Sequence, residues 1–131
     1  MISKVILIGA TLFIIIGICL GALGAHSIQP LISSSELDSF RTGVDYQLYH
    51  GLSILVLALL TDRLNIKFLW PIRLMFAGVI LFSGSIYLLS LKTILGIGSW
   101  VSVLGPITPI GGLILISSWI SLLVISFKLR K

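Results

Sequence analysis

Long apolar segments alternate with short polar ones along this chain. The first runs from Val5 to Leu23, and its only clearly polar residue is Thr11. Another runs from Leu74 to Leu91, between Arg73 and Lys92. A helix needs roughly 20 apolar residues to cross the hydrocarbon core of a bilayer, so each segment predicts a transmembrane helix. The first is also longer than the apolar core of a secretory signal peptide, about 7–15 residues, so we interpret it as a retained span.

The C-terminal apolar region is too long for a single crossing. No charged residue occurs from Thr93 to Phe127, and glycines and prolines interrupt the first half of this region. Pro109 suits the first turn of a helix, where its missing N–H does no harm. We therefore place a span at about 109–127. Residues 93–108 are expected to form an apolar outer loop that lies at the membrane interface or dips into the membrane as a re-entrant segment.

The remaining span is short and polar at one end. Only Gly51–Leu60 is mainly apolar, with Ser53 its one polar residue, so a helix of membrane-spanning length must begin near Arg41. Upstream, Ser33 and Glu36 have the spacing of a capping box, in which two residues satisfy each other's backbone N–H groups at a helix start. We expect an interfacial helix that begins near Ser35 and continues into this span.

These segments predict an all-α integral membrane protein with one domain over residues 1–131. It is a four-transmembrane-helix bundle with spans at about 5–24, 41–60, 73–91 and 109–127. The composition agrees, because 57% of the residues are hydrophobic and only 10% are charged, whereas a soluble domain carries about 25% charged residues. So few charges cannot cover a water-soluble surface, so lipid is the main solvent.

Lysine and arginine are concentrated on one predicted side of the membrane. Two, Arg41 and Lys92, lie on the other side, and seven lie at the chain ends or between the second and third spans: Lys4, Arg63, Lys67, Arg73, Lys128, Arg130 and Lys131. Basic loops stay cytoplasmic, so we expect both termini in the cytoplasm of a bacterial cell and the protein in its plasma membrane. The basic residues form no patch, which argues against nucleic-acid binding and favours contact with lipid headgroups.

Small residues recur at spacings that allow close helix packing. Gly17, Gly21 and Ala25 follow one another at four-residue intervals in the first span, and such a ladder lets another helix approach closely. The alternative interpretation is that such glycines line a pore or let a ligand approach the helix. We expect helix packing at Gly17, Gly21, Gly78, Gly84 and Gly111.

Polar side chains collect at the outer ends of the predicted spans. At about 100° per residue, Gln47 and His50 share one face of the second span. His26 ends the first span, and Tyr87 lies about one helical turn from the end of the third. We expect these four side chains to meet at the outer end of the bundle. The full candidate cluster comprises His26, Asp45, Gln47, Tyr49, His50, Ser83 and Tyr87.

Two interpretations of this cluster remain open. Ionisable residues within a span are costly and favour a functional site, such as a proton relay or a ligand site. A structural polar network is the alternative, because Arg41 and Asp45 have the spacing of an ion pair. We expect no metal and no cofactor, since His26 and His50 are not at a familiar ligand spacing. Ser83 beside a histidine is too little to predict a hydrolase.

Four stretches of this chain resemble a known family. They are GALGAH at 21–26, FRTGVDYQLYH at 40–50, LFSGSIY at 81–87 and TPIGG at 108–112. Together they are similar to the domain-of-unknown-function 423 membrane proteins, which include animal transmembrane protein 256. The family often has a glycine before the tryptophan of the last span, where this chain has Ser118. The resemblance implies a small multispan membrane protein and supplies no established activity, and so no catalytic residues.

We therefore expect a small, non-enzymatic multispan membrane protein. Its outer-leaflet polar cluster organises the bundle and is available to a small ligand or a lipid headgroup, with membrane lipid as its partner. The alternative is a small transporter or channel for protons, ions or small molecules. That alternative favours a homo-oligomer, because four helices enclose little volume alone.

Overall fold

A computed structural model describes residues 4–64 and 66–129, and every regular element in these ranges is helical. The four long helices are α1 (Lys4–Leu23), α2 (Ser34–Leu64), α3 (Leu69–Ser90) and α5 (Val101–Lys128). Shorter segments join them. A π-helix, η1 (Gly24–Ile28), and a 3₁₀ turn (Gln29–Leu31) follow α1. The helix α4 (Lys92–Leu95) and a 3₁₀ turn (Gly98–Trp100) lie between α3 and α5.

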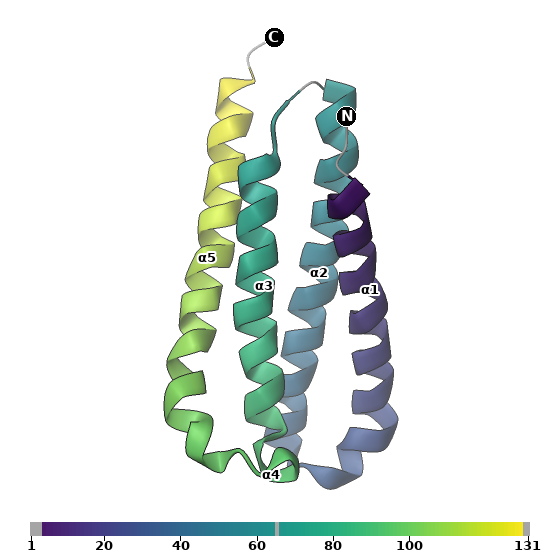
Figure 1. Cartoon of the computed structure of the whole chain (residues 1–131), viewed down its shortest axis with the longest axis vertical. Coiled ribbons are helices and arrows are strands. Elements are labelled where there is room, and N and C mark those ends of the chain that lie inside the picture. The colour runs from purple at the N-terminus through teal and green to yellow at the C-terminus, as the bar shows by residue number, and fades with distance from the viewer. Residues whose placement is uncertain (1–3, 65, 130–131) are drawn as a thin grey trace.

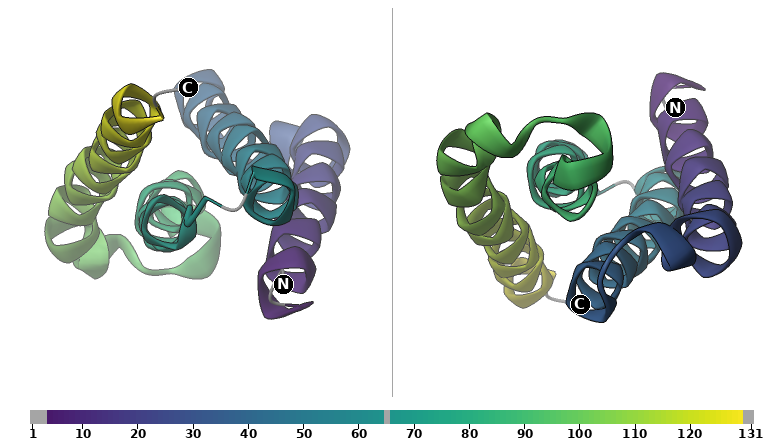
Figure 2. Two further views of the ribbon diagram at one scale, coloured as in Figure 1. Left: turned by 90° about the horizontal axis from the view of Figure 1, so that it is seen from above. Right: turned by 90° about the horizontal axis from the view of Figure 1, so that it is seen from below.

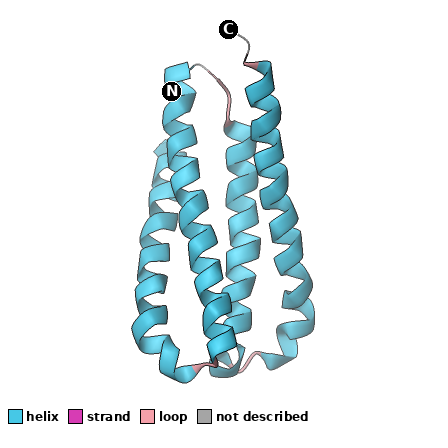
Figure 3. Cartoon of the chain, turned by 180° about the vertical axis from the view of Figure 1, so that it is seen from behind, coloured by secondary structure: helices cyan, strands magenta, loops and turns pink. Residues whose placement is uncertain are grey.

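The long helices stand side by side as an antiparallel bundle. The start of α1 and the end of α5 lie at one end, here called the terminal end, and α4 lies at the other, the α4 end (Figure 1). Helix α1 packs on α2, α2 on α3, and α3 on α5. Figure 2 shows α5 and α2 on two different sides of α3. The connections between the long helices are confined to the two ends of the bundle (Figure 3).

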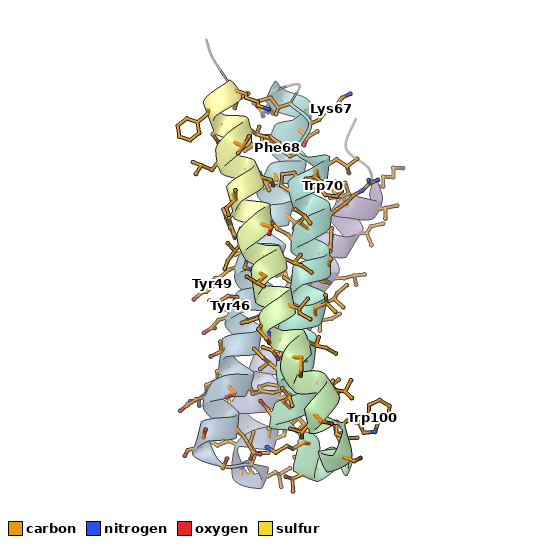
Figure 4. All side chains as sticks on the ribbon, turned by 90° about the vertical axis from the view of Figure 1, so that its left-hand side faces the viewer. Tyr46, Tyr49, Lys67, Phe68, Trp70 and Trp100 are labelled. Atoms are coloured by element: carbon orange, nitrogen blue, oxygen red, sulfur yellow. The ribbon has the colours of Figure 1, made fainter. Side chains whose placement is uncertain are left out.

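The outer surface of the bundle is apolar. Each of the four long helices is long and apolar enough to cross a membrane. Large side chains such as Leu113, which is 63% exposed, and Phe127, which is 77% exposed, face outward. Two exposed tryptophans, Trp70 and Trp100, lie toward opposite ends (Figure 4), as aromatic residues do at the two interfaces of a membrane. Such a surface is suited to lipid rather than to water.

The apolar core lies toward the terminal end. Ile54 and Met75 are fully buried there, together with Ala10, Leu57, Phe68 and Ile72. The rings of Phe13 and Phe76 meet edge to face with their centroids 5.1 Å apart. This half of the bundle is therefore filled by apolar side chains from α1, α2 and α3.

Helix α2 begins as the capping-box spacing predicts. The N–H of Glu36 donates to Ser33 Oγ at 3.3 Å, and the N–H of Ser33 donates to Glu36 Oε2 at 3.0 Å. From Ser34 the helix continues without interruption to Leu64. The interfacial helix expected before the second span is thus the first part of α2 itself.

Helix α5 begins earlier than the sequence predicts. It starts at Val101, so Pro109 does not stand in its first turn, and both Pro106 and Pro109 lie inside the helix. An internal proline removes a backbone donor, but neighbouring helices allow this in membrane proteins. Here α5 packs so closely on α3 that a Cβ added to Gly111 would collide with the α3 backbone. Tertiary packing therefore outweighs the local preference of the prolines.

The connection between α3 and α5 is correspondingly shorter than the loop expected at 93–108. Helix α4 ends at Leu95 and is capped by Gly96, whose φ of 65° lies in the left-handed region, which glycine adopts without steric cost. The N–H of Gly96 turns back to the carbonyl of Thr93 at 3.4 Å. The 3₁₀ turn that ends at Trp100 then leads directly into α5.

Candidate functional site

A chain of hydrogen bonds crosses the bundle at Gln47. The hydroxyl of Tyr87 donates to Gln47 Oε1 at 2.7 Å, and Gln47 Nε2 donates to the carbonyl of Phe13 at 2.8 Å. Gln47 is only 5% exposed. Because its amide is both donor and acceptor, this one side chain on α2 links α3 to α1.

Two glycines make room for this chain of hydrogen bonds. A Cβ on Gly17 would lie 2.7 Å from Leu48 Cδ2 and 3.6 Å from Gln47 Nε2. A Cβ on Gly43 would lie 2.8 Å from Cε1 of Tyr87. Gly17 therefore lets α2 approach the carbonyl of Phe13, and Gly43 lets the tyrosine ring lie against α2. Gly43 was not among the packing glycines expected from the sequence.

His50 links α2 to α5. Its Nδ1 lies 2.7 Å from the carbonyl of Tyr46, and the indole Nε1 of Trp119 donates to its Nε2 at 3.1 Å. An indole N–H can only donate and a carbonyl can only accept. The partners therefore assign a neutral ring that carries its proton on Nδ1. We call Gln47, His50, Tyr87 and Trp119 the polar layer.

Other members of the predicted cluster lie outside the polar layer. His26 is exposed in η1 and hydrogen-bonds none of the four residues of the layer. Asp45 and Tyr49 are exposed on α2, with Tyr49 61% exposed (Figure 4). The expected Arg41–Asp45 pair is not the one formed, since Arg41 Nη1 lies 3.6 Å from a carboxylate oxygen of Asp38 instead.

The two serines of α3 have different environments. Ser85 Oγ lies 2.7 Å from the hydroxyl of Thr108 and donates to the carbonyl of Phe82 at 3.0 Å, which links α3 to α5. Ser83 is buried, and its hydroxyl has no hydrogen-bond partner within residues 4–64 and 66–129. In the same ranges, no three His, Cys, Asp or Glu side chains gather as a metal site would require.

The predicted packing glycines differ in how tightly they are enclosed. A Cβ on Gly78 would overlap the side chain of Leu115, and one on Gly111 would collide with the backbone of Phe82. A Cβ on Gly21 would make an ordinary contact, 3.4 Å from Val44 Cγ1. Gly84 differs from the expectation, because a Cβ there would meet nothing within 4 Å.

A cavity of about 540 Å³ opens at the α4 end, between α2, α3 and α5. Serine and threonine residues of all three helices line it: Ser39 and Thr42 on α2, Ser90 on α3 and Thr108 on α5. Ile86 and Leu89 supply an apolar part of its wall. We call this space the end cavity.

One ion pair stands on the wall of the end cavity. Lys92 Nζ donates to Glu36 Oε1, which joins the start of α2 to α4. From the sequence, Glu36 was expected in the helix cap and Lys92 among the outer charges, and no pair between them was predicted. The available signal was that opposite charges occur in both connections on the same predicted side of the membrane.

These features define the class of the protein: a small integral membrane protein with four membrane-spanning helices. The family described as "Protein of unknown function (DUF423)" matches residues 20–112. The chain belongs to this family, as its motifs indicate.

Several curated relatives cover almost the whole chain. The UPF0382 membrane protein SAB0533 of Staphylococcus aureus is 41% identical over 124 residues, which cover 89% of this chain and 96% of that protein. The UPF0382 membrane protein YwdK of Bacillus subtilis is 40% identical over 130 residues, which cover 95% and 98%. No solved structure matches the chain.

Proposed function

We propose that this protein is a non-enzymatic membrane protein that binds a small polar ligand or a lipid headgroup in the end cavity, while the polar layer holds the helices in place. The observation that carries the proposal is the cavity itself. Its volume of about 540 Å³ falls within the range of roughly 300–1,000 Å³ found for ligand pockets. Its walls combine hydroxyl groups, an ion pair and apolar side chains, a mixture suited to an amphipathic ligand.

The hydrogen bonds of the polar layer support a structural role for its residues. Both polar atoms of the Gln47 amide and both ring nitrogens of His50 already have protein partners. A ligand that entered the layer would have to break these bonds, and a buried group left unpaired costs about 1–3 kcal/mol. Ligand binding is therefore better supported at the end cavity than at the polar layer.

The contacts of the serines and histidine support a non-enzymatic function. A serine nucleophile needs a base within hydrogen-bond reach. Ser85 is bonded to Thr108 and to a backbone carbonyl, and the acceptor nitrogen of His50 is occupied by Trp119. These groups are held in helix contacts rather than aimed at a substrate.

The membrane orientation is part of the proposal. The seven-to-two distribution of basic residues favours a cytoplasmic terminal end and an external α4 end. The end cavity would then open in the outer leaflet. Because the curated relatives named above come from bacteria and are membrane proteins, we propose the bacterial plasma membrane as the location.

Packing at the terminal end argues against transport through a single copy. A path for ions would have to cross the region filled by Ile54, Ile72 and Met75, each at most 2% exposed. We expect proteoliposomes that contain the protein to show the same proton and ion flux as empty vesicles. A protein-dependent flux would favour the transport alternative instead.

Retained lipid or ligand tests the binding function. We expect protein purified in mild detergent to keep about one polar lipid or small ligand per chain. Stripping that molecule should lower the melting temperature, and a membrane lipid extract should restore it, because a ligand that binds only the folded state stabilises it. A stripped protein with an unchanged melting temperature, with or without the extract, would contradict the proposal.

A further inference from the structure

We propose that the end cavity selects the headgroup of a zwitterionic phospholipid, with Lys92 facing its phosphate and Glu36 facing its ammonium group. The inference rests on the proposed binding function and adds the class of ligand. It follows from how charges, donors and acceptors are divided between the walls of the cavity.

The charges on the cavity wall match a ligand that carries both signs. Lys92 and Glu36 both line the cavity and pair with each other, so the wall has one positive and one negative group. A purely anionic headgroup would meet the carboxylate of Glu36 as well as the lysine. The nearby Asp38–Arg41 pair also combines opposite charges and is largely exposed on α2.

The α2 wall presents acceptors. Ser39 donates its hydroxyl hydrogen to the carbonyl of Ser35 at 3.0 Å, and Thr42 donates to the carbonyl of Asp38 at 3.0 Å. Each hydroxyl therefore keeps only its oxygen lone pairs for a ligand. Together with the Glu36 carboxylate, they form a wall suited to the N–H groups of an ammonium ion.

The α4 wall presents a donor, the Lys92 ammonium. Ser90 on α3 also lines the cavity, but its hydroxyl oxygen is covered by the protein and has no hydrogen-bond partner in the described part of the chain. Buried polar groups of this kind are rarely left unpaired. Rotation of the serine side chain toward the cavity would let it donate to a phosphate or ester oxygen.

The position of the cavity favours a lipid over a free solute. Helices α2 and α5 each pack on α3, and Figure 2 shows them on different sides of it, so the cavity lies between two helices whose outer surfaces face the bilayer. Ile86 and Leu89 line it beside the polar groups. Trp100 projects outward at the same end (Figure 4), at the depth where headgroups lie.

One substitution adds side-chain volume at the cavity wall. Gly105 lines the cavity, and a Cβ there would meet no atom within 4 Å, so we expect the side chain of Gly105→Leu to take up ligand space. A residue before proline resists the helical conformation, yet Thr108 holds the same place before Pro109 in α5. Gly84→Leu is the matched control, because Gly84 has equally open surroundings and does not line the cavity.

The test is native mass spectrometry of detergent-purified protein with equal amounts of phosphatidylethanolamine and phosphatidylglycerol. We expect the parent and Gly84→Leu to bind phosphatidylethanolamine about tenfold more tightly than phosphatidylglycerol, the effect of one hydrogen bond to a charged group. Gly105→Leu should lose this binding. Glu36→Gln should lose the preference while it still binds phospholipid through Lys92.

Three outcomes would overturn the inference. One is equal or stronger binding of phosphatidylglycerol by the parent, which would leave the proposed binding function standing with another ligand class. Another is an unchanged preference in Glu36→Gln or Gly105→Leu, which would locate the site elsewhere. The third is no binding of either lipid and no retained ligand, which would overturn the proposed function as well. Melting curves of all variants identify any loss that comes from unfolding.

Discussion

Within the polar layer, Gln47 forms hydrogen bonds to two other helices. It accepts from Tyr87 on α3 and donates to the carbonyl of Phe13 on α1, and its side chain is buried. Its neighbour His50 reaches the fourth long helix through Trp119. Two side chains one turn apart on α2 thus contact all three other long helices.

The first prediction concerns the coupling between Gln47 and Tyr87. Tyr87→Phe removes the donor to Gln47 Oε1, and Gln47→Leu removes both bonds of the amide. Contacting residues show interaction energies of about 0.5–3 kcal/mol, so we expect the two changes to be non-additive by that amount. The measurement is a double-mutant cycle on unfolding in detergent.

Two controls accompany this cycle. Tyr49→Phe changes the same kind of side chain where it is 61% exposed, and it should leave stability unchanged. His26→Ala and His50→Ala should be additive, because His26 is exposed in η1. Additivity of the Gln47 and Tyr87 changes would contradict the assigned hydrogen bond.

For single residues, the sequence predicts the helix face of a side chain better than it predicts the hydrogen-bond partners of that side chain. The shared face of Gln47 and His50 follows from helical geometry alone, and both side chains are buried. Their hydrogen-bond partners on other helices are the Phe13 carbonyl and Trp119. These pairings depend on tertiary packing, which the helical periodicity of the sequence does not show. His26 was misplaced because it was assigned by its height at the end of the first span. The buried positions of α1 and η1 are Ala10, Gly17 and Gly24, and at about 100° per residue His26 lies opposite this face.

In the packing of the helices, the main feature is the close contact of α3 with α5. Gly78 and Gly111 stand on opposite sides of this contact, and each lacks the side chain that would hold the helices apart. Ser85 and Thr108 join the same two helices by a hydrogen bond toward the α4 end. The contact explains why α5 keeps its helical form through Pro106 and Pro109.

The second prediction tests this contact at Gly111. Gly111→Ala places a Cβ against the backbone of Phe82, which cannot move aside as a flexible side chain can. We expect a loss of about 1–3 kcal/mol, as overpacking usually gives, and a lower melting temperature in detergent.

Gly84→Ala is the matched control on the partner helix. It adds the same methyl group where nothing lies within 4 Å, and alanine is favoured over glycine in a helix interior by roughly 0.5–1 kcal/mol. Its melting temperature should stay equal or rise. A Gly111→Ala protein as stable as Gly84→Ala would show that α3 and α5 are not packed this closely.

The sequence predicts the long elements but not all of their ends. The capping box predicted the start of α2, because its signal lies within four neighbouring residues. The start of α5 could not be predicted in the same way. The local signals of Gly105, Pro106 and Pro109 favour a break, and only the contact with α3 explains why a helix passes through them.

For the whole molecule, the start of α1 and the end of α5 lie at one end, and α4 lies at the other (Figure 1). The ion pair of the end cavity joins α4 to the start of α2. The apolar core fills the terminal half, and the end cavity lies in the α4 half. The charge distribution could predict an orientation from sequence. The cavity could not be predicted, because it is formed by residues from α2, α3, α4 and α5 that are far apart in the chain.

The third prediction concerns orientation in the membrane. On a Cys19→Ser background, Ser34→Cys places a thiol at the α4 end and Lys67→Cys places one between α2 and α3. We expect a membrane-impermeant thiol reagent to label position 34 and not position 67 in intact cells, because basic loops stay cytoplasmic. Permeabilised cells, in which both should react, provide the control, and the reverse pattern in intact cells would contradict the proposed topology.

A structure of the protein in a lipid bilayer that contains phosphatidylethanolamine and phosphatidylglycerol would show directly whether the space between α2, α3 and α5 at the α4 end holds a polar ligand or headgroup. We predict a headgroup in contact with Lys92, Glu36 and Ser90, with α2 and α5 apart on either side of it. A cavity closed by α2 against α5, or filled only by acyl chains, would contradict the account.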